Sequence, residues 1–514
     1  MAVLLLDNIS SDHISLHALI AVALLLTYIA FKTYNIYTKN RPYPDVPLVA
    51  LPGKTPKDSW IKYGNETIKL GLETTADNQP FQIMTGTGPK IVLRNRYADE
   101  VARHKDLSFS ENIRVDLMVH YPGFEGIAVG VSGSTLTRDT INRKLTQSLG
   151  LVTEDLVEEA TDSIHDIFGE SSEWRSTKIK ADIQQMVSRL SSRVFLGKPL
   201  CRNQRWLDIA KDYTVHIFNA ARDLRAISSL VRPVKHWFVP NCRALRKDVK
   251  DAKALISGEV ARREAAARAL LAQGKKPPKK ADAIAWFVET AQESGENLSV
   301  DDLVYYQLGL TIAAIHTTTE ATCQALQHLC ENPQYIQPLR DEIIQKVGEH
   351  GWAKTSLYQL RLMDSFLKES QRHSRGLSSL QRVATSDIVL SDSYTIKRGT
   401  RIALVSSFMD EKNYPDPFRF DAHRFLEKRE QYVTVSAQHL GFGLGLHACP
   451  GRFFVANELK IALAHLLLKY DWSFDPEKGR NQAIEMEGQP MWNPESKLRY
   501  KRRKEEIDLS LVTQ

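Results

Sequence analysis

The residues around Cys449 have the types and spacing that chemistry requires. Cys449 lies in the stretch GFGLGLHACPGR (441–452), whose glycines let the backbone fold tightly and approach a flat object. Pro450 suits the first position of a helix, so Cys449 would lie just before a helix N-terminus, where the macrodipole and free N–H groups stabilise a thiolate. Such a thiolate acts as a metal ligand or a nucleophile, whereas most lone cysteines are inert and buried.

The surrounding sequence separates these roles. A nucleophile needs a base, and no histidine–acid pair can be assigned to Cys449, because His447 lies two residues away along the same loop. Zinc needs further ligands, and no second cysteine or histidine has ligand spacing to Cys449. A single thiolate suits haem iron, because the porphyrin supplies the equatorial ligands. The residues therefore favour a haem ligand.

Two further stretches place polar residues where helices are expected. In ESQR, Glu369 and Arg372 are three residues apart and share one helix face. In AAIHTTTEAT (313–322), three successive threonines follow His316, although β-branching and hydroxyl back-bonding loosen a helix. The small residues before them suit a groove for a planar cofactor and O2, and the alternative is a polar helix interior that contacts water.

The stretch FGLGLHACPG (442–451) resembles the haem-thiolate loop of the cytochrome P-450 superfamily, which reads F-x-x-G-x-[RH]-x-C-x-G. Every fixed position matches. The resemblance implies that Cys449 is the axial ligand of haem b and that Phe442 packs near its sulfur. It also implies haem contacts from Gly443 in the loop and from His447 to a propionate.

The motifs before this loop resemble the same superfamily in the same order. ESQR is similar to its E-x-x-R pair, and Arg424 in DAHRF (421–425) is similar to the arginine that joins the pair. The resemblance implies that Glu369, Arg372 and Arg424 form a buried network behind the haem. That network would be structural and not catalytic.

The threonine-rich stretch resembles the pattern [AG]-G-x-[DE]-T-[TS], whose first threonine assists O–O bond cleavage. Thr317 aligns with that threonine, and His316 stands where an acid is typical. The resemblance makes both residues candidate catalytic residues, with His316 as a proton relay because histidine titrates near neutrality. The wording A-x-I-H-T-T is similar to that of fungal secondary-metabolite members of the superfamily.

Two arginines are further candidates for the haem propionates. Arg382 in SSLQRVAT resembles the propionate-binding arginine on the strand that follows the E-x-x-R helix. Arg143 resembles the arginine of the W-x-x-x-R helix, although Asp139 occupies the tryptophan position.

The hydrophobic pattern predicts a mostly α chain with a minor β-sheet region, the class to which the cytochrome P-450 fold belongs. One long helix is expected over 299–332, where Ser299 and Asp302 suit a capping box. Further helices are expected over 364–374 and 451–470. Alternation predicts strands within FQIMTGTGPKIVLRN and a hairpin within DIVLSDSYTIKRGTRIALVSS with its turn at KRGT.

The N-terminus predicts a membrane anchor ahead of one catalytic domain. Residues 14–31 carry no fully charged side chain over a length that just spans a bilayer core. Acidic residues precede this segment and basic residues follow it, which places 1–13 in the lumen and the rest in the cytosol. A signal peptide and a buried helix are the alternatives. A Pro-rich hinge over 32–53 and a catalytic domain over 54–514 complete the expected organisation, and Asn8 in NIS is a candidate glycosylation site.

Composition excludes several other classes. The chain of 514 residues has a modest net charge of +7, and its most basic run, KLRYKRRK, lacks the aromatic interleaving of a nucleic-acid platform, so no nucleic-acid partner is expected. Five scattered cysteines fit a reducing compartment without a disulfide framework.

The resemblance implies a monooxygenase that inserts one atom of O2 into a C–H bond. The expected substrate is a bulky lipophilic secondary metabolite, such as a terpenoid, meroterpenoid or indole alkaloid of a fungal pathway. Expected partners are NADPH–cytochrome P-450 reductase, cytochrome b5 and membrane lipid at the endoplasmic reticulum. The alternatives are a reductase-independent haem-thiolate isomerase or dehydratase, and a non-catalytic membrane-tethered binding protein.

Overall fold

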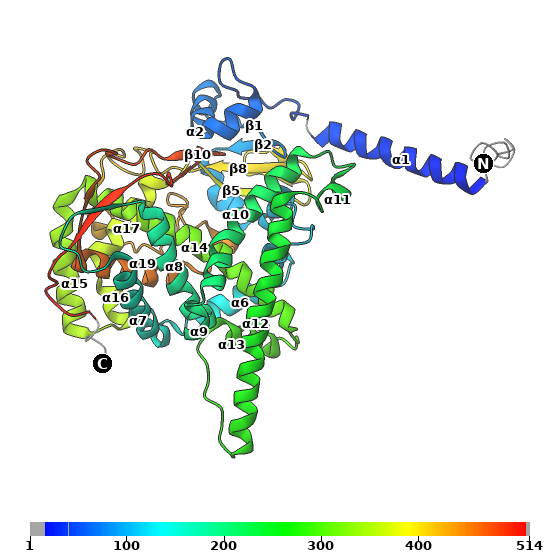
Figure 1. The fold of residues 1–514 in the computed structure, drawn as a ribbon. Coiled ribbons are helices and arrows are strands. Elements are labelled where there is room, and N and C mark those ends of the chain that lie inside the picture. The colour runs from blue at the N-terminus through cyan, green and yellow to red at the C-terminus, as the bar shows by residue number, and fades with distance from the viewer. Residues whose placement is uncertain (1–15, 40, 510–514) are drawn as a thin grey trace, which may run out of the picture.

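A computed structural model describes residues 16–39 and 41–509, and most of them are helical (Figure 1). The predicted mostly α architecture with a small β component is confirmed. The α-helices are α1 (Leu16–Lys39), α2 (Pro56–Thr74), α3 (Ala98–Arg103), α4 (Phe109–Leu117), α5 (Glu125–Ala128), α6 (Leu136–Asp139), α7 (Leu149–Phe168), α8 (Ile179–Leu196), α9 (Lys198–Cys201), α10 (Gln204–Ala226), α11 (Arg232–Lys235), α12 (Pro240–Ala272), α13 (Ala283–Glu293), α14 (Val300–Glu331), α15 (Ile336–His350), α16 (Lys354–Gln359), α17 (Arg361–Ser374), α18 (Arg424–Glu427) and α19 (Arg452–Lys469).

Within the described residues, the strands form one five-stranded sheet and three smaller ones. The larger sheet has the order β1-β2-β8-β5-β3, in which β2 and β8 are parallel and the other neighbours are antiparallel. The strands are β1 (Phe81–Thr85), β2 (Gly88–Leu93), β3 (Leu107–Ser108), β4 (Arg175–Thr177), β5 (Ser378–Ala384), β6 (Ile388–Val389), β7 (Thr395–Ile396), β8 (Arg401–Val405), β9 (Tyr470–Phe474), β10 (Ile484–Met486), β11 (Gln489–Met491) and β12 (Leu498–Arg502).

Helix α14 runs through the middle of the helical body, where it packs against α8, α10, α12, α17 and α19. Its start is fixed by the predicted capping box, because the Ser299 side chain accepts from the Asp302 amide and the Asp302 carboxylate accepts from the Ser299 amide. The helix ends at Glu331, just before Pro333. The long helix predicted over 299–332 is therefore confirmed.

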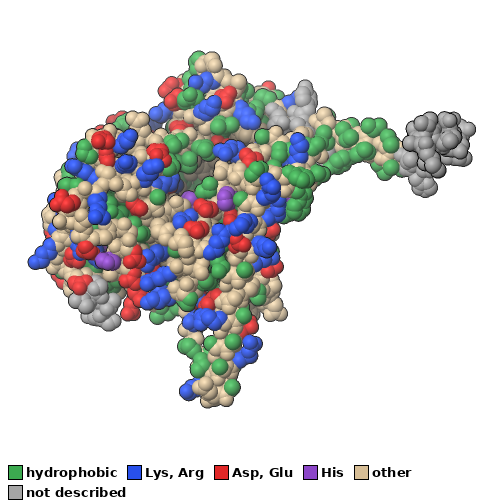
Figure 2. Space-filling view, in the orientation of Figure 1, with side chains coloured by type: hydrophobic (Ala, Val, Ile, Leu, Met, Phe, Trp, Pro, Cys, Tyr) green, Lys and Arg blue, Asp and Glu red, His purple; other side chains and the backbone are tan. Residues whose placement is uncertain are grey.

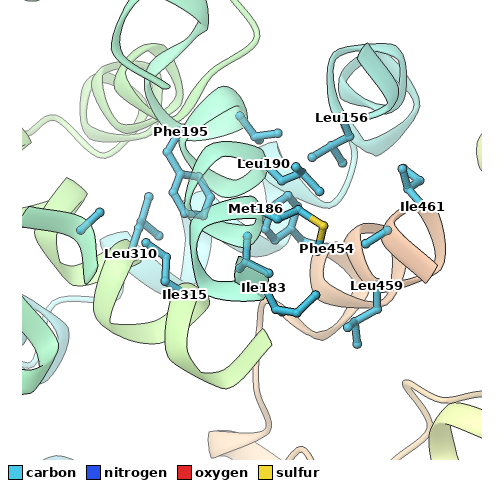
Figure 3. Packing of buried hydrophobic residues seen from close by; sticks show 14 of the residues in the cluster. Leu156, Ile183, Met186, Leu190, Phe195, Leu310, Ile315, Phe454, Leu459 and Ile461 are labelled. Atoms are coloured by element: carbon cyan, nitrogen blue, oxygen red, sulfur yellow. The ribbon is translucent and has the colours of Figure 1, made fainter. Parts of the chain in front are cut away.

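Helices α8, α14 and α19 bury a shared apolar core (Figure 3). Phe195 of α8 lies against Phe454 of α19 with ring centroids 5.5 Å apart, and Met186 and Ile315 are fully buried in the same cluster. Fully burying one such side chain contributes about 1.5–3 kcal/mol. This packing fixes α19, and with it the end of the loop that carries Cys449.

The strand predictions are confirmed in one place and corrected in another. Strands β1 and β2 are the strands expected in 81–95, and they pair as a hairpin. In 387–407, the hairpin joins β6 to β7 and turns between them, whereas KRGT connects β7 to β8. Gly399 of that turn adopts a φ of +81°. The turn at KRGT thus passes the chain to the five-stranded sheet, because β8 pairs with β2 and β5 and not with β7.

Helix α1 projects from the body on its own (Figure 1), and Figure 2 shows that its surface is largely hydrophobic. Within residues 16–39 and 41–509, no helix combines the length and apolarity that a bilayer span requires. The anchor over 14–31 stays a prediction, and its first two residues and Asn8 lie outside the described residues. The helix continues to Lys39, so the extended hinge is shorter than the predicted 32–53, because no proline occurs before Pro42.

Candidate functional site

The loop around Cys449 is folded by a backbone hydrogen bond across its base. The Cys449 amide donates to the Phe442 carbonyl at 2.8 Å, and the chain between them turns through glycines in the left-handed region, with φ of +73° at Gly443 and +66° at Gly445. A Cβ on Gly445 would lie 2.5 Å from the Ala102 carbonyl oxygen of α3. The glycines are therefore required both for the turn and for its close approach to α3.

The electrostatics at Cys449 differ in part from the prediction. Burial raises the pKa of the thiol, while backbone hydrogen bonds from Gly451 and Arg452 and the charge of Arg375 act to lower it. Helix α19 begins at Arg452, so Pro450 precedes the helix instead of taking its first position. The helix terminus acts in the predicted direction, but burial outweighs it. A metal cation at the sulfur would reverse that balance, since coordinating thiols are deprotonated.

Helix α14 exposes small and hydroxyl side chains although its other faces are buried. Ala313 and Thr317, one turn apart, are exposed, whereas Ile315, Thr318 and Thr319 are buried. The Thr317 hydroxyl donates to the Ala313 carbonyl at 2.7 Å. This back-bonding satisfies the hydroxyl within the helix, which stays α-helical through the threonine run. The exposed stripe has the composition of the groove that the sequence predicts.

The structure separates His316 from Thr317. Nε2 of His316 lies 2.7 Å from the Lys211 backbone carbonyl oxygen of α10 and 3.4 Å from the side-chain Nε2 of Gln184 of α8. Burial lowers the pKa of His316. Consecutive helical residues point about 100° apart, so His316 faces α8 and α10 while Thr317 lies on the exposed stripe. The contacts of His316 therefore differ from those that a relay to Thr317 requires.

Arg382 is a buried cation whose hydrogen-bonding capacity is only partly used. It is 2% exposed, and Nη1 donates to the Gln381 carbonyl at 2.8 Å. Nε and Nη2 are buried without a partner among the described residues, and burial lowers the pKa of Arg382 to about 10. Buried donors are nearly always satisfied in native proteins. A ligand carboxylate such as a haem propionate fits these two donors.

Other basic residues adjoin Arg382. His447 on the Cys449 loop is exposed, yet partial desolvation of its ring by the surrounding protein, followed by the charges of Arg382 and Arg138, lowers its pKa. The aromatic ring of Phe109 lies 5.9 Å from His447 and 5.6 Å from the Arg382 guanidinium carbon. The structure thus gathers His447 and Arg382 at one place, as the sequence predicts, and adds Arg138, which belongs to no recognised motif.

Arg143 has a different environment. It lies in the π-helical segment η3 (Thr140–Leu145), where its side chain is exposed. Arg138, five residues earlier, is the residue of this region whose charge acts on His447. The propionate contact of Arg143 stays a prediction.

The residues of the E-x-x-R motif form a satisfied buried network. Arg372 donates to Glu369 through Nε at 2.8 Å and Nη2 at 2.7 Å, and Arg424 donates to the same carboxylate at 3.1 Å. Glu369 and Arg372 are fully buried. Burial acts to raise the pKa of Glu369, but the hydrogen bonds of Arg372 and His373 and the charge of Arg424 outweigh it and lower the value to about 2.

One buried acid near the site was not predicted. Glu458 of α19 is fully buried, and its Oε1 accepts from Ser191 of α8 at 2.7 Å. Burial raises the pKa of Glu458 to about 8 against the lowering effect of Ser191 and Thr318. Thr318 directly follows Thr317 on α14. An acid within the apolar run of 452–469 is the sequence signal that would have identified it.

Comparison with known proteins agrees with this arrangement. Residues 79–501 match the family model described as Cytochrome P-450. The chain is 38% identical to the cytochrome P-450 monooxygenase bsc2 of Alternaria brassicicola over 98% of both chains. It is 39% identical to cytochrome P-450 monooxygenase 1 of Gibberella fujikuroi over 84% of this chain and 99% of the relative. It is 37% identical to the cytochrome P-450 monooxygenase adrA of Penicillium rubens over 90% and 93%.

Proposed function

Since this chain belongs to the cytochrome P-450 family, and is a monooxygenase that holds haem through a cysteine thiolate, we propose that it oxidises a bulky lipophilic metabolite in a fungal biosynthetic pathway. The proposed substrate is a terpenoid, a meroterpenoid or an indole alkaloid. The observation that carries the proposal is a buried arginine with unused donors beside the glycine-rich loop that holds the cysteine. An exposed hydroxyl stripe on α14 supports it.

Each of these groups has a distinct task. Cys449 would supply the thiolate, and the glycines around it would let the backbone approach a planar group closely. Arg382 and His447 orient the carboxylates of that group. When bound, haem supplies the centre at which O2 is activated.

Thr317 is the proposed proton-handling residue. Its hydroxyl is exposed and donates to the Ala313 carbonyl, so rotation about χ1 can exchange that bond for one to a ligand. The small side chain of Ala313 leaves room for a ligand beside the Thr317 hydroxyl. His316 is proposed only to fix α14 against α10, since its Nε2 lies at the Lys211 carbonyl.

The proposed electron donor is an NADPH-dependent reductase, with cytochrome b5 as a second donor. Arg452 lies beside the Cys449 loop, where its Nη1 donates to the Cys449 carbonyl at 2.7 Å, and it is proposed to contribute a positive rim for an acidic partner. The exposed hydrophobic side chains of α1 support attachment to the endoplasmic reticulum membrane, with the catalytic domain in the cytosol.

A cysteine replacement tests haem ligation. We expect Cys449→Ser to abolish the thiolate-type absorption band that the reduced wild-type protein shows with carbon monoxide. Cys330→Ser is the matched control, because Cys330 is also half-buried but lies on α14. Loss of the band in both variants, or in neither, would contradict the assignment of Cys449.

Incubation with a metabolite panel tests the reaction. Microsomes that contain this chain and the reductase should yield a product that is heavier by one oxygen atom, and only with NADPH. A product of unchanged mass formed without NADPH would show an isomerase instead.

A threonine replacement tests the proton path. Thr317→Ala should divert NADPH consumption from product to reduced oxygen species. Thr319→Ala is the control, because Thr319 makes the same type of backbone bond, to Ile315, but is buried on another face of α14. Equal coupling in the wild type and Thr317→Ala would remove Thr317 from this role.

A further inference from the structure

Helix α4 covers the candidate haem-propionate residues. At its first residue, Phe109, the ring lies 5.6 Å from the Arg382 guanidinium carbon and 5.9 Å from the His447 ring. A partly exposed aromatic ring therefore lies beside both basic side chains. The position of α4 thus affects how well water is kept from Arg382, which is 2% exposed.

Apolar packing alone holds α4 weakly. Of its nine residues, all within the described ranges, Asn112 and Leu117 are buried, whereas Phe109 and Val115 are each 40% exposed. Ile113 packs against the main core but is only partly buried, so Leu117 is the one buried apolar side chain among these nine residues. Polar contacts must therefore contribute to its placement.

Arg114 Nε donates to the Val131 carbonyl at 3.0 Å, and the charged contacts converge on Asp116 at the other end of α4. Oδ1 of Asp116 accepts from Arg401 of β8 and from Thr87 at 2.7 Å, and Oδ2 lies 3.5 Å from Nζ of Lys90 on β2. Lys90 and Arg401 are 2% and 6% exposed. Removing the carboxylate would leave two buried cations without their anion, which is strongly unfavourable.

The same cluster connects Asp116 to the strand that carries Arg382. Nζ of Lys90 donates to the side-chain carbonyl of Gln381, the residue next to Arg382 on β5. Both ends of α4 are thus attached to adjacent residues of one strand, through Phe109 at one end and through Asp116 and Lys90 at the other. A change at Asp116 is therefore transmitted to the cover over Arg382.

We propose that Asp116 is a positioning residue for the haem site, which acts through Lys90 and Arg401 to hold α4 so that Phe109 stays over the Arg382 guanidinium and shields it from water. The proposal rests on haem binding at Cys449. It assigns to this ion cluster a role in retaining the cofactor in addition to its role in fold stability.

The test combines hydrogen exchange with haem release in the full-length holoenzyme. In Asp116→Asn, amide hydrogens of 109–117 should exchange at least about tenfold faster, and haem should transfer to apomyoglobin about tenfold faster, than in the wild type. Asp116→Glu retains the charge and should restore most of both properties. Unchanged exchange in 109–117 together with unchanged haem release would overturn the proposal.

A control at a second buried ion cluster separates positioning from general stability. Glu159 of α7 is fully buried and paired with Arg189 at 2.6 Å and Arg202 at 2.8 Å, away from α4. Glu159→Gln should lower the free energy of unfolding without faster exchange in 109–117. Equal acceleration of that exchange and of haem release in Glu159→Gln would reduce the effect to stability and overturn the proposal.

Two milder variants apply if Asp116→Asn does not fold. Thr87→Val removes one hydrogen bond to Asp116 and should accelerate both processes by a smaller factor. Phe109→Ala removes the cover itself and should accelerate haem release without changing the ion cluster. Unchanged haem release in Phe109→Ala would contradict the shielding step. Because the Cys449 band reports ligation independently, failure of this proposal is distinguishable from failure of haem binding.

Discussion

Arg372 and Arg382 are both buried and only ten residues apart, yet they differ in how many of their donors are hydrogen-bonded. Arg372 donates to both oxygens of Glu369 and to the Phe408 carbonyl at 2.7 Å. Arg382 donates to one carbonyl and has two buried donor atoms without a partner among the described residues. A buried arginine whose donors are bonded to protein acceptors has a structural role, whereas a buried arginine with unused donors indicates a ligand.

Glu458 lies between these two extremes. Its Oε1 accepts a hydrogen bond from Ser191, while its Oε2 has no hydrogen-bond partner in the described part of the chain. The hydroxyl of Thr318 is close enough to act to lower the pKa of Glu458. The raised pKa of Glu458 follows from burial without a cation. The three buried groups therefore form a series from fully to partly hydrogen-bonded. Replacing each of them should change the stability of the protein by a different amount.

The largest loss of stability is expected at Glu369, whose buried network is fully hydrogen-bonded. Glu369→Gln leaves Arg372 and Arg424 without a counter-ion and should lower the free energy of unfolding by about 3–5 kcal/mol. Urea unfolding of the holoenzyme measures this loss. Asp99→Asn, which removes an exposed pair with Arg103, should cost less than about 1 kcal/mol. Similar losses in the two variants would contradict a special role for the buried network.

The same variant has a predicted pH signature. The pKa of Glu369 is about 2 in the folded protein and 4.5 when unperturbed, so its contribution to stability is present above pH 4.5 and is lost as the pH falls toward 2. Glu369→Gln should remove this part of the acid dependence.

An effect of opposite pH direction is expected at Glu458. Its folded pKa of about 8 exceeds the unperturbed 4.5, so the folded state holds a proton that the unfolded state has released, and stability falls as the pH rises between these values. A tenfold difference in proton affinity between the folded and unfolded states corresponds to about 1.4 kcal/mol. Glu458→Gln should flatten this decline, as seen in unfolding midpoints from pH 5 to 8. A decline of unchanged slope would show that Glu458 is not its source.

The smallest effect on stability is expected at the incomplete site. Arg382→Gln removes buried donors that lack partners, so the haem-free protein should change by less than about 1 kcal/mol. Haem release from the holoenzyme should accelerate roughly tenfold, because a hydrogen bond to a charged group contributes about 1.5–3 kcal/mol. Arg268→Gln on the exposed end of α12 is the control. A large loss of stability without a change in haem release would make Arg382 structural, like Arg372.

Some parts of the site could be predicted from local sequence because local contacts determine them. The capping box of α14 involves residues three apart, and the turn at Gly443 and Gly445 requires glycine wherever it occurs. Glu369 and Arg372 share a helix face for the same reason. The resemblance added Arg424, which joins that pair from a distant segment.

Other parts could not be predicted because they depend on which segments meet. Sequence spacing placed His316 beside Thr317, but the packing of α14 against α8 and α10 gives them different neighbours. Burial at Cys449 reverses the direction of the pKa shift expected from its helix terminus, and burial is a tertiary property.

The sequence by itself determined the chemistry of this protein, because a thiolate ligand, its glycines and its turn are encoded within twelve residues, 441–452. Tertiary structure alone decided which charged groups are satisfied. Lys90, Asp116 and Arg401 come from three distant segments, and their ion cluster exists only after the sheet has formed and α4 has packed beside it. The physical reason is that hydrogen bonds and burial depend on distance in space, and separation along the chain does not fix that distance.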